Sequence, residues 1–238
     1  MTQDVARTGL DELITYYDDA TGERVGLSAA ELGDWSSATS ALLTRGCGLR
    51  AGSQAAVLLP PHWQTAVVLL GCWATGVEVS FRGWSTAGLS PAGLPLDVSF
   101  VEQRRIDSWL DDVPSAGYQF SLPLGAASAP PAGYDDFATA VSAWLGAAPP
   151  AGAVGADDRA TVIGETYGQY GAIAAGIADM RGIGPGDRVL VDAAASEQPL
   201  VWLLAPLSVG ASIVLCANFD RTRLDERVAA ERVTRVLG

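Results

Sequence analysis

Short apolar runs alternate along the chain with longer apolar or amphipathic stretches, and glycine-rich turns separate them. The runs that predict strands are "AAVLL" (55–59), "VEVSF" (77–81), "RVLVD" (188–192) and "SIVLC" (212–216). The stretches "WQTAVVLLGCWATG" (63–76) and "QPLVWLLAPLSVG" (198–210) predict helices, with a kink at Pro206 in the second. Apolar strands that alternate with helices are typical of parallel sheets covered on both faces. The pattern therefore predicts an α/β fold with mainly parallel sheets sandwiched by helices.

The chain repeats this helix–strand–helix–strand pattern once. When residues 48–59 are aligned with residues 182–193, residues 66–80 fall on residues 200–214 without a gap. The two copies predict two related α/β subdomains, residues 1–150 and residues 151–238. The segment "GAAPPAGAVGADD" (146–158) has the composition of a linker between them.

Each copy opens with a helix-start signal called a capping box. Ser28 stands three residues before Glu31, and Thr166 stands three residues before Gln169. Directly before the second box, "DDRATVI" (157–163) predicts a strand. The order of strand, short gap and capped helix is typical of phosphate-binding segments, in which a glycine-rich loop fills the gap.

The remaining elements lie between and after the two copies. The predicted strands are 97–102, 118–122 and 233–238. The predicted helices are 103–112, 134–146 and 220–233. The last of these helices, "DRTRLDERVAAERV", is so highly charged that it predicts a surface helix.

Composition limits the classes of function. The net charge is −12 and all fifteen basic residues are arginine, so repulsion from phosphate backbones makes nucleic acid an unsuitable partner. Cys47, Cys72 and Cys216 are an odd number in apolar or glycine-rich surroundings, which favours buried or free thiols in a reducing compartment over a disulfide framework. The N-terminal residues carry no apolar signal-peptide core, and the longest apolar stretches are short or broken by Pro and Gly. We expect a cytoplasmic protein that does not enter a membrane.

The segments at 27–77, 182–215 and 219–238 resemble the N-terminal part of the AMP-binding (adenylate-forming) superfamily, which includes acyl-CoA synthetases and peptide-synthetase adenylation domains. Within that superfamily the chain is most similar to a short actinobacterial group of unknown function. The resemblance implies two similar α/β subdomains. It covers nearly the whole chain, and it is carried by structural motifs rather than catalytic ones.

The chain departs from the superfamily where catalysis would be expected. The resemblance implies a phosphate loop closed by Lys before Thr166, but only Gly164 and Glu165 separate the predicted strand from that residue. The chain contains no Lys, and "DAAASEQPL" (192–200) lacks the histidine that the resemblance implies there. The acyl pocket, the Mg-binding Glu motif and the C-terminal lid have no counterpart. We therefore expect a catalytically degenerate protein that acts as an interaction or ligand-sensing module. The alternative is one half of a split adenylate-forming enzyme, an acid-activating ligase completed by a partner chain.

Four residues form the candidate crevice. His62, the single His of the chain, stands at a strand-to-helix turn, on the edge where α/β sheets usually bind ligands. The equivalent turn of the second copy holds Asp192, Ser196 and Glu197, so the four would line one crevice if the two halves face each other. The structural alternatives are a helix-start residue for His62, a strand-end acid for Asp192 and a first-turn acid for Glu197.

Other charged and metal-binding patterns are weaker. Arg104 and Arg105 stand near a predicted helix start, where they would either grip an anion or form a solvated helix face. A single His and three distant Cys give no metal site. No cofactor is required by this interpretation, and AMP, ATP or CoA are the candidate ligands.

The expectation of a partner follows from the superfamily segments that have no counterpart in this chain. The surface that those segments would cover should be apolar, and large apolar patches are seldom left open to water. We therefore expect a homodimer or a partner protein. The alternative is that polar residues, such as those of "DERVAAER" (225–232), have replaced the apolar face.

Overall fold

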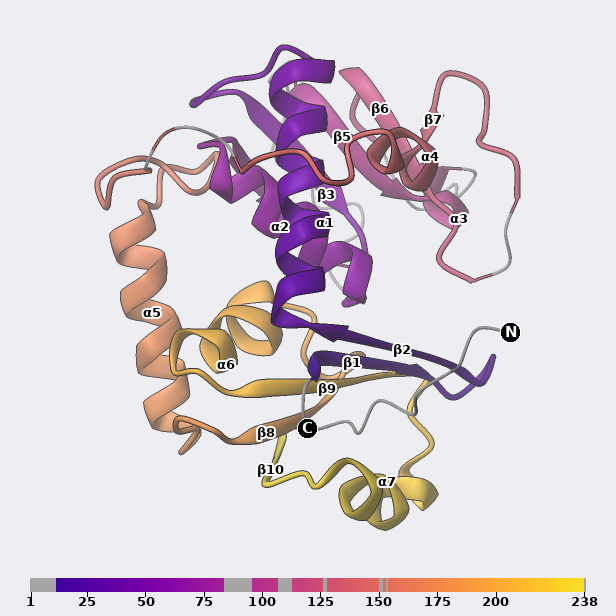
Figure 1. The fold of residues 1–238 in the computed structure, drawn as a ribbon, viewed down its shortest axis with the longest axis vertical. Coiled ribbons are helices and arrows are strands. Elements are labelled where there is room, and N and C mark those ends of the chain that lie inside the picture. Colours follow the sequence, from indigo (N-terminus) through magenta and orange to yellow (C-terminus); the bar gives the residue numbers. More distant parts are fainter. Residues whose placement is uncertain are drawn as a thin grey trace. The chain divides into compact units, whose positions relative to one another are not determined.

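A computed structural model describes residues 12–83, 96–106, 113–125, 128–149, 152 and 154–237. Within these residues the chain forms two five-stranded sheets, each with helices beside it (Figure 1). The chain divides into two compact units. Unit 1 consists of Met1–Leu32 and Ala174–Gly238, and unit 2 consists of Gly33–Ile173. The predicted α/β fold with mainly parallel sheets is confirmed.

Unit 2 contains a parallel sheet with the strand order β4-β3-β5-β6-β7. Its strands are β3 (Gln54–Leu58), β4 (Glu78–Phe81), β5 (Leu96–Glu102), β6 (Ala116–Leu122) and β7 (Asp135–Asp136). Its helices are α2 (Trp63–Ala74), α3 (Gln103–Ile106) and α4 (Phe137–Ser142), and α1 (Ala29–Ala41) enters it from unit 1 and continues as the π-helical turn η1 (Leu42–Gly46). Phe100 on β5 packs against Phe120 on β6 and Phe137 on α4, with ring centroids 5.5 and 5.6 Å away. These buried rings fix α4 on one face of the sheet.

Unit 1 contains a sheet with the order β10-β8-β9-β1-β2, in which only the β1–β2 pair is antiparallel. Its strands are β1 (Glu12–Asp18), β2 (Glu23–Ser28), β8 (Arg188–Asp192), β9 (Ser212–Ala217) and β10 (Arg235–Leu237). Its helical segments are α5 (Tyr167–Met180), which starts in unit 2, η3 (Leu200–Leu204), α6 (Ala205–Ser208), η4 (Arg221–Arg223) and α7 (Leu224–Glu231). Figure 1 shows α6 and α7 on opposite faces of this sheet.

The two copies of the predicted repeat have matching backbone hydrogen bonds and strand pairs. Strands β3 and β4 pair Gln54 with Glu78, and β8 pairs with β9 at the corresponding positions. In the first copy the Gly52 amide donates to the Gly76 carbonyl at 2.9 Å, and in the second the Gly186 amide donates to the Gly210 carbonyl at 3.1 Å. All four glycines have positive φ angles, between 74° and 84°, which other residues rarely adopt. The gap-free alignment therefore reflects the same turn geometry in both copies.

Both predicted capping boxes are present. The Glu31 amide donates to Ser28 Oγ at 3.3 Å while Glu31 accepts from the Ser28 amide at 2.9 Å. Thr166 and Gln169 make the same reciprocal pair, at 3.3 and 2.9 Å. These bonds satisfy amides that a helix start otherwise leaves unpaired. The predicted helix at 198–210 is found as η3 followed by α6, and its winding changes from π to α just before Pro206.

Several predicted elements differ from the structure. The units do not divide the chain at 150/151, because β1 pairs with β9 and so joins the first residues of the chain to the C-terminal part. The hairpin of β1 and β2 was not predicted. The segment 157–163 is not a strand: its only sheet contact is a single bridge between Thr161 and Val79. The predicted helix at 103–112 is found at its start, as α3, and residues 107–112 lie outside the described residues.

The C-terminal helix is not simply the surface helix that its charges predict. Arg227 and Glu231 of α7 are buried, at 4% and 6% exposure. Beside them, Leu224 packs on the apolar cluster formed by Leu190, Val214 and Cys216 of the sheet. Because α7 covers this face with charged side chains as well as apolar ones, those charges require buried partners. No helix in the described part of the chain is both long enough and apolar enough to span a membrane.

Candidate functional site

The four residues of the candidate crevice belong to different units. His62 lies in unit 2, whereas Asp192, Ser196 and Glu197 lie in unit 1. Their meeting in one crevice therefore stays a prediction.

His62 is the N-cap of helix α2. Its Nδ1 atom accepts a hydrogen bond from the Gln64 amide at 3.1 Å, and its ring lies 5.7 Å from that of Trp63. Since Nδ1 accepts, the proton of the neutral ring is on Nε2. The side chain is 4% exposed. His62 thus has the helix-start role that the sequence left open as an alternative.

Charged side chains surround the carboxyl edge of the sheet in unit 2. The connection after β3 leads to β4 on one side, and the connection after β5 leads to β6 on the other, which makes this edge a topological switch point. Arg82 follows β4, Glu102 ends β5, and Arg105 lies in α3. The Arg105 Nη1 atom donates to the Arg82 carbonyl at 2.8 Å, and Glu102 accepts from Arg104 Nε at 2.6 Å.

The neighbouring residues Arg104 and Arg105 differ in burial. The Arg104 side chain is 73% exposed, as expected for a solvated helix face. Arg105 is completely buried, so a solvated face is the wrong interpretation for this residue. Sequence reasoning did not select Arg82 or Glu102. The available signal was a charged residue at the carboxyl end of an apolar strand, as in "VSFR" (79–82) and "FVE" (100–102).

Asp192 ends strand β8 in unit 1 and is engaged within its own unit. Its carboxylate accepts from the Ala194 amide at 3.0 Å and pairs with Arg221 at 2.9 Å. The Ser196 amide donates to the Asp192 carbonyl at 3.1 Å. Glu197 follows, partly buried, before the turn η3. These contacts order the turn after β8 and agree with the strand-end alternative for Asp192.

The turn before α5 occupies the place of the expected phosphate loop. The amides of Ala160 and Thr161 both donate to the Glu165 carbonyl, at 2.8 and 3.3 Å. The Glu165 amide donates to Thr161 Oγ1 at 3.1 Å, and the Gly164 amide donates to the Thr161 carbonyl at 3.0 Å. Gly164 has a φ of 97°, a conformation that suits glycine. The turn is therefore closed on itself by its own amides.

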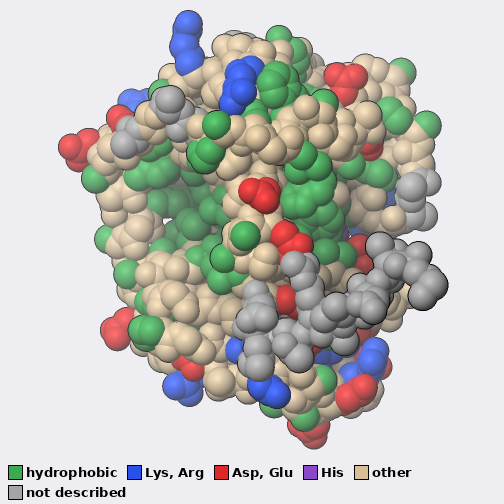
Figure 2. Space-filling view, viewed as in Figure 1, with side chains coloured by type: hydrophobic (Ala, Val, Ile, Leu, Met, Phe, Trp, Pro, Cys, Tyr) green, Lys and Arg blue, Asp and Glu red, His purple; other side chains and the backbone are tan. Residues whose placement is uncertain are grey.

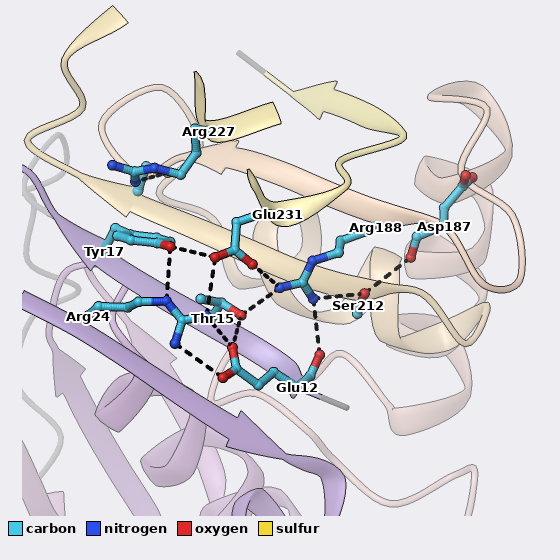
Figure 3. A network of polar contacts seen from close by, with 10 residues as sticks. Glu12, Thr15, Tyr17, Arg24, Asp187, Arg188, Ser212, Arg227 and Glu231 are labelled. Carbon is cyan, nitrogen blue, oxygen red and sulfur yellow. Dashed lines mark hydrogen bonds and ion pairs between the residues drawn. The ribbon is translucent and has the colours of Figure 1, made fainter. Parts of the chain in front are cut away.

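A polar network lies inside unit 1 (Figure 3). Arg188 Nη2 donates to Glu231 Oε2 at 2.5 Å and to Thr15 Oγ1 at 2.8 Å, and Nη1 donates to the Glu12 carbonyl at 3.1 Å. Arg24 binds the Glu12 carboxylate at 2.8 Å and Glu231 at 3.2 Å. Two guanidinium groups and two carboxylates thus compensate one another between β1, β2, β8 and α7.

Tyr17 and Arg227 extend the network towards the carboxyl end of β1. The Tyr17 hydroxyl donates to Glu231 Oε1 at 2.5 Å, and the Arg227 guanidinium lies 3.6 Å from the centre of the Tyr17 ring. Arg227 also pairs with Asp19 at 2.7 Å. Burial, together with the bond to Glu231, raises the pKa of Tyr17. Burial alone would raise the pKa of Glu231, but bonds from Tyr17, Arg188 and Arg24 hold it below its usual value.

The three thiols are buried and free, as predicted. Burial raises the pKa of Cys47 and of Cys216 to about 11, and it also raises the pKa of Cys72. At neutral pH all three are therefore protonated, which makes them weak nucleophiles and weak metal ligands. In the described part of the chain, no three His, Cys, Asp or Glu side chains are grouped closely enough to hold a metal ion.

Charges on the visible surface are mixed. On the face drawn in Figure 2, arginine and acidic side chains of the described residues stand singly or in small groups of both signs. This face therefore presents no extended basic surface of the kind that binds a nucleic-acid backbone.

Known proteins that are similar to this chain fall into two groups, one matched in sequence and one matched in structure. No family model matches it. A TIGR03089 family protein of Mycobacterium tuberculosis (strain ATCC 25618 / H37Rv) is 37% identical over 233 residues, which cover 94% of this chain and 90% of that protein. The alignment thus extends over nearly the full length of both.

Solved structures share the fold at low identity. Acetoacetyl-CoA synthetase from Streptomyces lividans matches 95% of this chain with a TM-score of 0.72 and 20% identity, and the N-terminal domain of FACL13 from M. tuberculosis matches 94% with a TM-score of 0.66 and 18% identity. The chain spans 39% of the synthetase and 58% of the FACL13 chain. The predicted resemblance to the N-terminal part of acyl-CoA synthetases is confirmed, and at these identities it establishes the fold alone.

Proposed function

The chain belongs to the TIGR03089 family, and from that premise we propose that it is a catalytically degenerate relative of acyl-CoA synthetases that acts as an interaction or ligand-sensing module. The fold is that of the synthetase N-terminal region. The proposal is that the fold is retained while adenylation is lost.

The closed turn at Thr161–Glu165 carries this proposal. A phosphate loop binds its anion through amides that point outward at the start of a helix. Here the amides of Thr161, Gly164 and Glu165 are occupied by acceptors within the turn itself. The Glu165 carboxylate, which accepts from Thr161 Oγ1 at 3.1 Å, adds a negative charge at the same place. Both features oppose the binding of a nucleotide phosphate.

The supply of cations supports the same conclusion. Adenylation builds negative charge at the α-phosphate and on pyrophosphate, so preorganised cations are needed to stabilise it. The chain contains no Lys. Arg24, Arg188 and Arg227 are among the arginines that pair with acids inside unit 1. Their charge is therefore already balanced by the fold.

ATP–pyrophosphate exchange tests the proposal. The purified protein is incubated with Mg-ATP, labelled pyrophosphate and a panel of short, medium and long carboxylic acids, with the S. lividans synthetase and acetoacetate as the positive control. We expect no exchange above the protein-free background for any acid. Exchange that follows the purified protein and saturates with one acid would overturn the proposal.

A second function is supported by the fraction of the synthetase that this chain spans. The chain spans 39% of the matched synthetase, so an acid-activating reaction would need the remaining parts from elsewhere. In this alternative the protein is one half of a split adenylate-forming enzyme. Affinity purification from the native cell distinguishes the two functions. Recovery of a second chain that restores exchange supports the split enzyme, and recovery of this chain alone, with no activity regained in cell extract, argues against it.

The proposed setting is the cytoplasm, with a homodimer or a partner protein. Three buried free thiols agree with a reducing compartment. No cofactor is required, and AMP, ATP and CoA are the ligands to test. The alternative, that polar groups have replaced an apolar face, is supported by the exposed Glu226 side chain of α7.

A further inference from the structure

No further inference is drawn: the strongest candidate, the surface patch on the outward face of helix α5 around the exposed Ile173 and Met180, is an apolar face for which no described part of the structure shows what covers it.

Discussion

Gly26 of strand β2 lies against the carboxylate of Glu12, where a side chain has no room. A Cβ atom on Gly26 would lie 2.0 Å from Glu12 Oε1. We expect Gly26→Ala to push this carboxylate away from Arg24 and Thr15, which it contacts at 2.8 and 2.6 Å. The lost contacts should lower the free energy of unfolding by about 1–3 kcal/mol. Urea denaturation measures the change.

Gly33→Ala is the matched control for that substitution. Gly33 lies inside helix α1, and nothing stands within 4 Å of the Cβ that the substitution would add. Alanine is the better helix former, so this variant should gain about 0.5–1 kcal/mol. If the two substitutions changed the free energy of unfolding equally, the contact between the added Cβ at position 26 and the Glu12 carboxylate would not be destabilising.

Glu231 makes stability depend on pH. Its pKa in the folded protein lies below the ordinary glutamate value of 4.5, because bonds from Tyr17, Arg188 and Arg24 outweigh burial. A lowered pKa means that the unfolded chain binds the proton more readily, so the contribution to stability is complete above about pH 4.5 and is lost as the pH falls through the folded pKa. Urea denaturation from pH 7 to pH 3 should show this decline.

The variant Glu231→Gln assigns part of the decline to this residue. At pH 7 it should lose about 3–5 kcal/mol, because Arg188 is then left buried without its carboxylate. The difference from the wild-type protein should shrink as the pH falls through the folded pKa of Glu231, which lies below 4.5, because the wild-type side chain then becomes protonated. A difference that stays constant over this range would contradict the assignment. Glu226→Gln, at a side chain 70% exposed on the same helix, should stay within about 0.5 kcal/mol of wild type at pH 7.

At the scale of elements, strand β1 completes the sheet of unit 1. Ile14 in this strand is completely buried and pairs with Ile213 of β9. Ile14→Ala should therefore cost about 2–5 kcal/mol in urea denaturation, through lost apolar contact and a cavity. The same substitution at Ile163, which is 76% exposed, should change stability by less than about 0.5 kcal/mol. A small effect at Ile14 would mean that β1 is not an integral strand of the sheet.

The elements that could be predicted are those whose signals are local. The two capping boxes depend on residues three positions apart, and the structure reproduces both. Strand β1 (Glu12–Asp18) was missed although its Ile, Thr and Tyr residues favour a strand and its hairpin partner β2 (Glu23–Ser28) is a local neighbour. Its pairing with β9, about 200 residues away, has no local signal. The apolar "ATVI" (160–163) suggested a strand, but the Thr161–Glu165 bonds close it into a turn.

The candidate site was harder to predict for the same reason. His62 was placed correctly at the start of α2, because its position between a strand and a helix is a local signal. Arg105 donates to the Arg82 carbonyl at the sheet edge because of the strand order, which the sequence does not display. Burial of Arg227 and Glu231 likewise depends on acids and arginines brought by β1, β2 and β8. The charges of the helix predicted at 220–233 therefore indicated a surface position, because the sequence does not show the buried partners of Arg227 and Glu231.

At the scale of the whole molecule, one of the two compact units is built from two separate stretches of the sequence. Unit 2 is inserted between the two parts of unit 1, so the sheet of unit 1 is complete only when both ends of the chain are present. The repeat predicted two subdomains, but it does not include β1 and β2 and so could not show where these strands pair. Discontinuous units of this kind follow from long-range parallel pairing, which requires a crossover connection.

Native mass spectrometry gives the last test, because it reports ligand and assembly together. The closed turn and the absence of Lys predict that the protein carries no nucleotide as purified and gains none with Mg-ATP at micromolar concentration. CoA is measured in parallel, since its phosphates also need cationic or amide donors. Stoichiometric AMP, ATP, CoA or acyl adducts would show that a ligand site survives, and substitution of His62 and Asp192 would then identify its location. The same spectra give the oligomeric state: a dimer agrees with the proposed interaction role, and a monodisperse monomer argues against a homodimer and leaves a different protein as the partner to be sought.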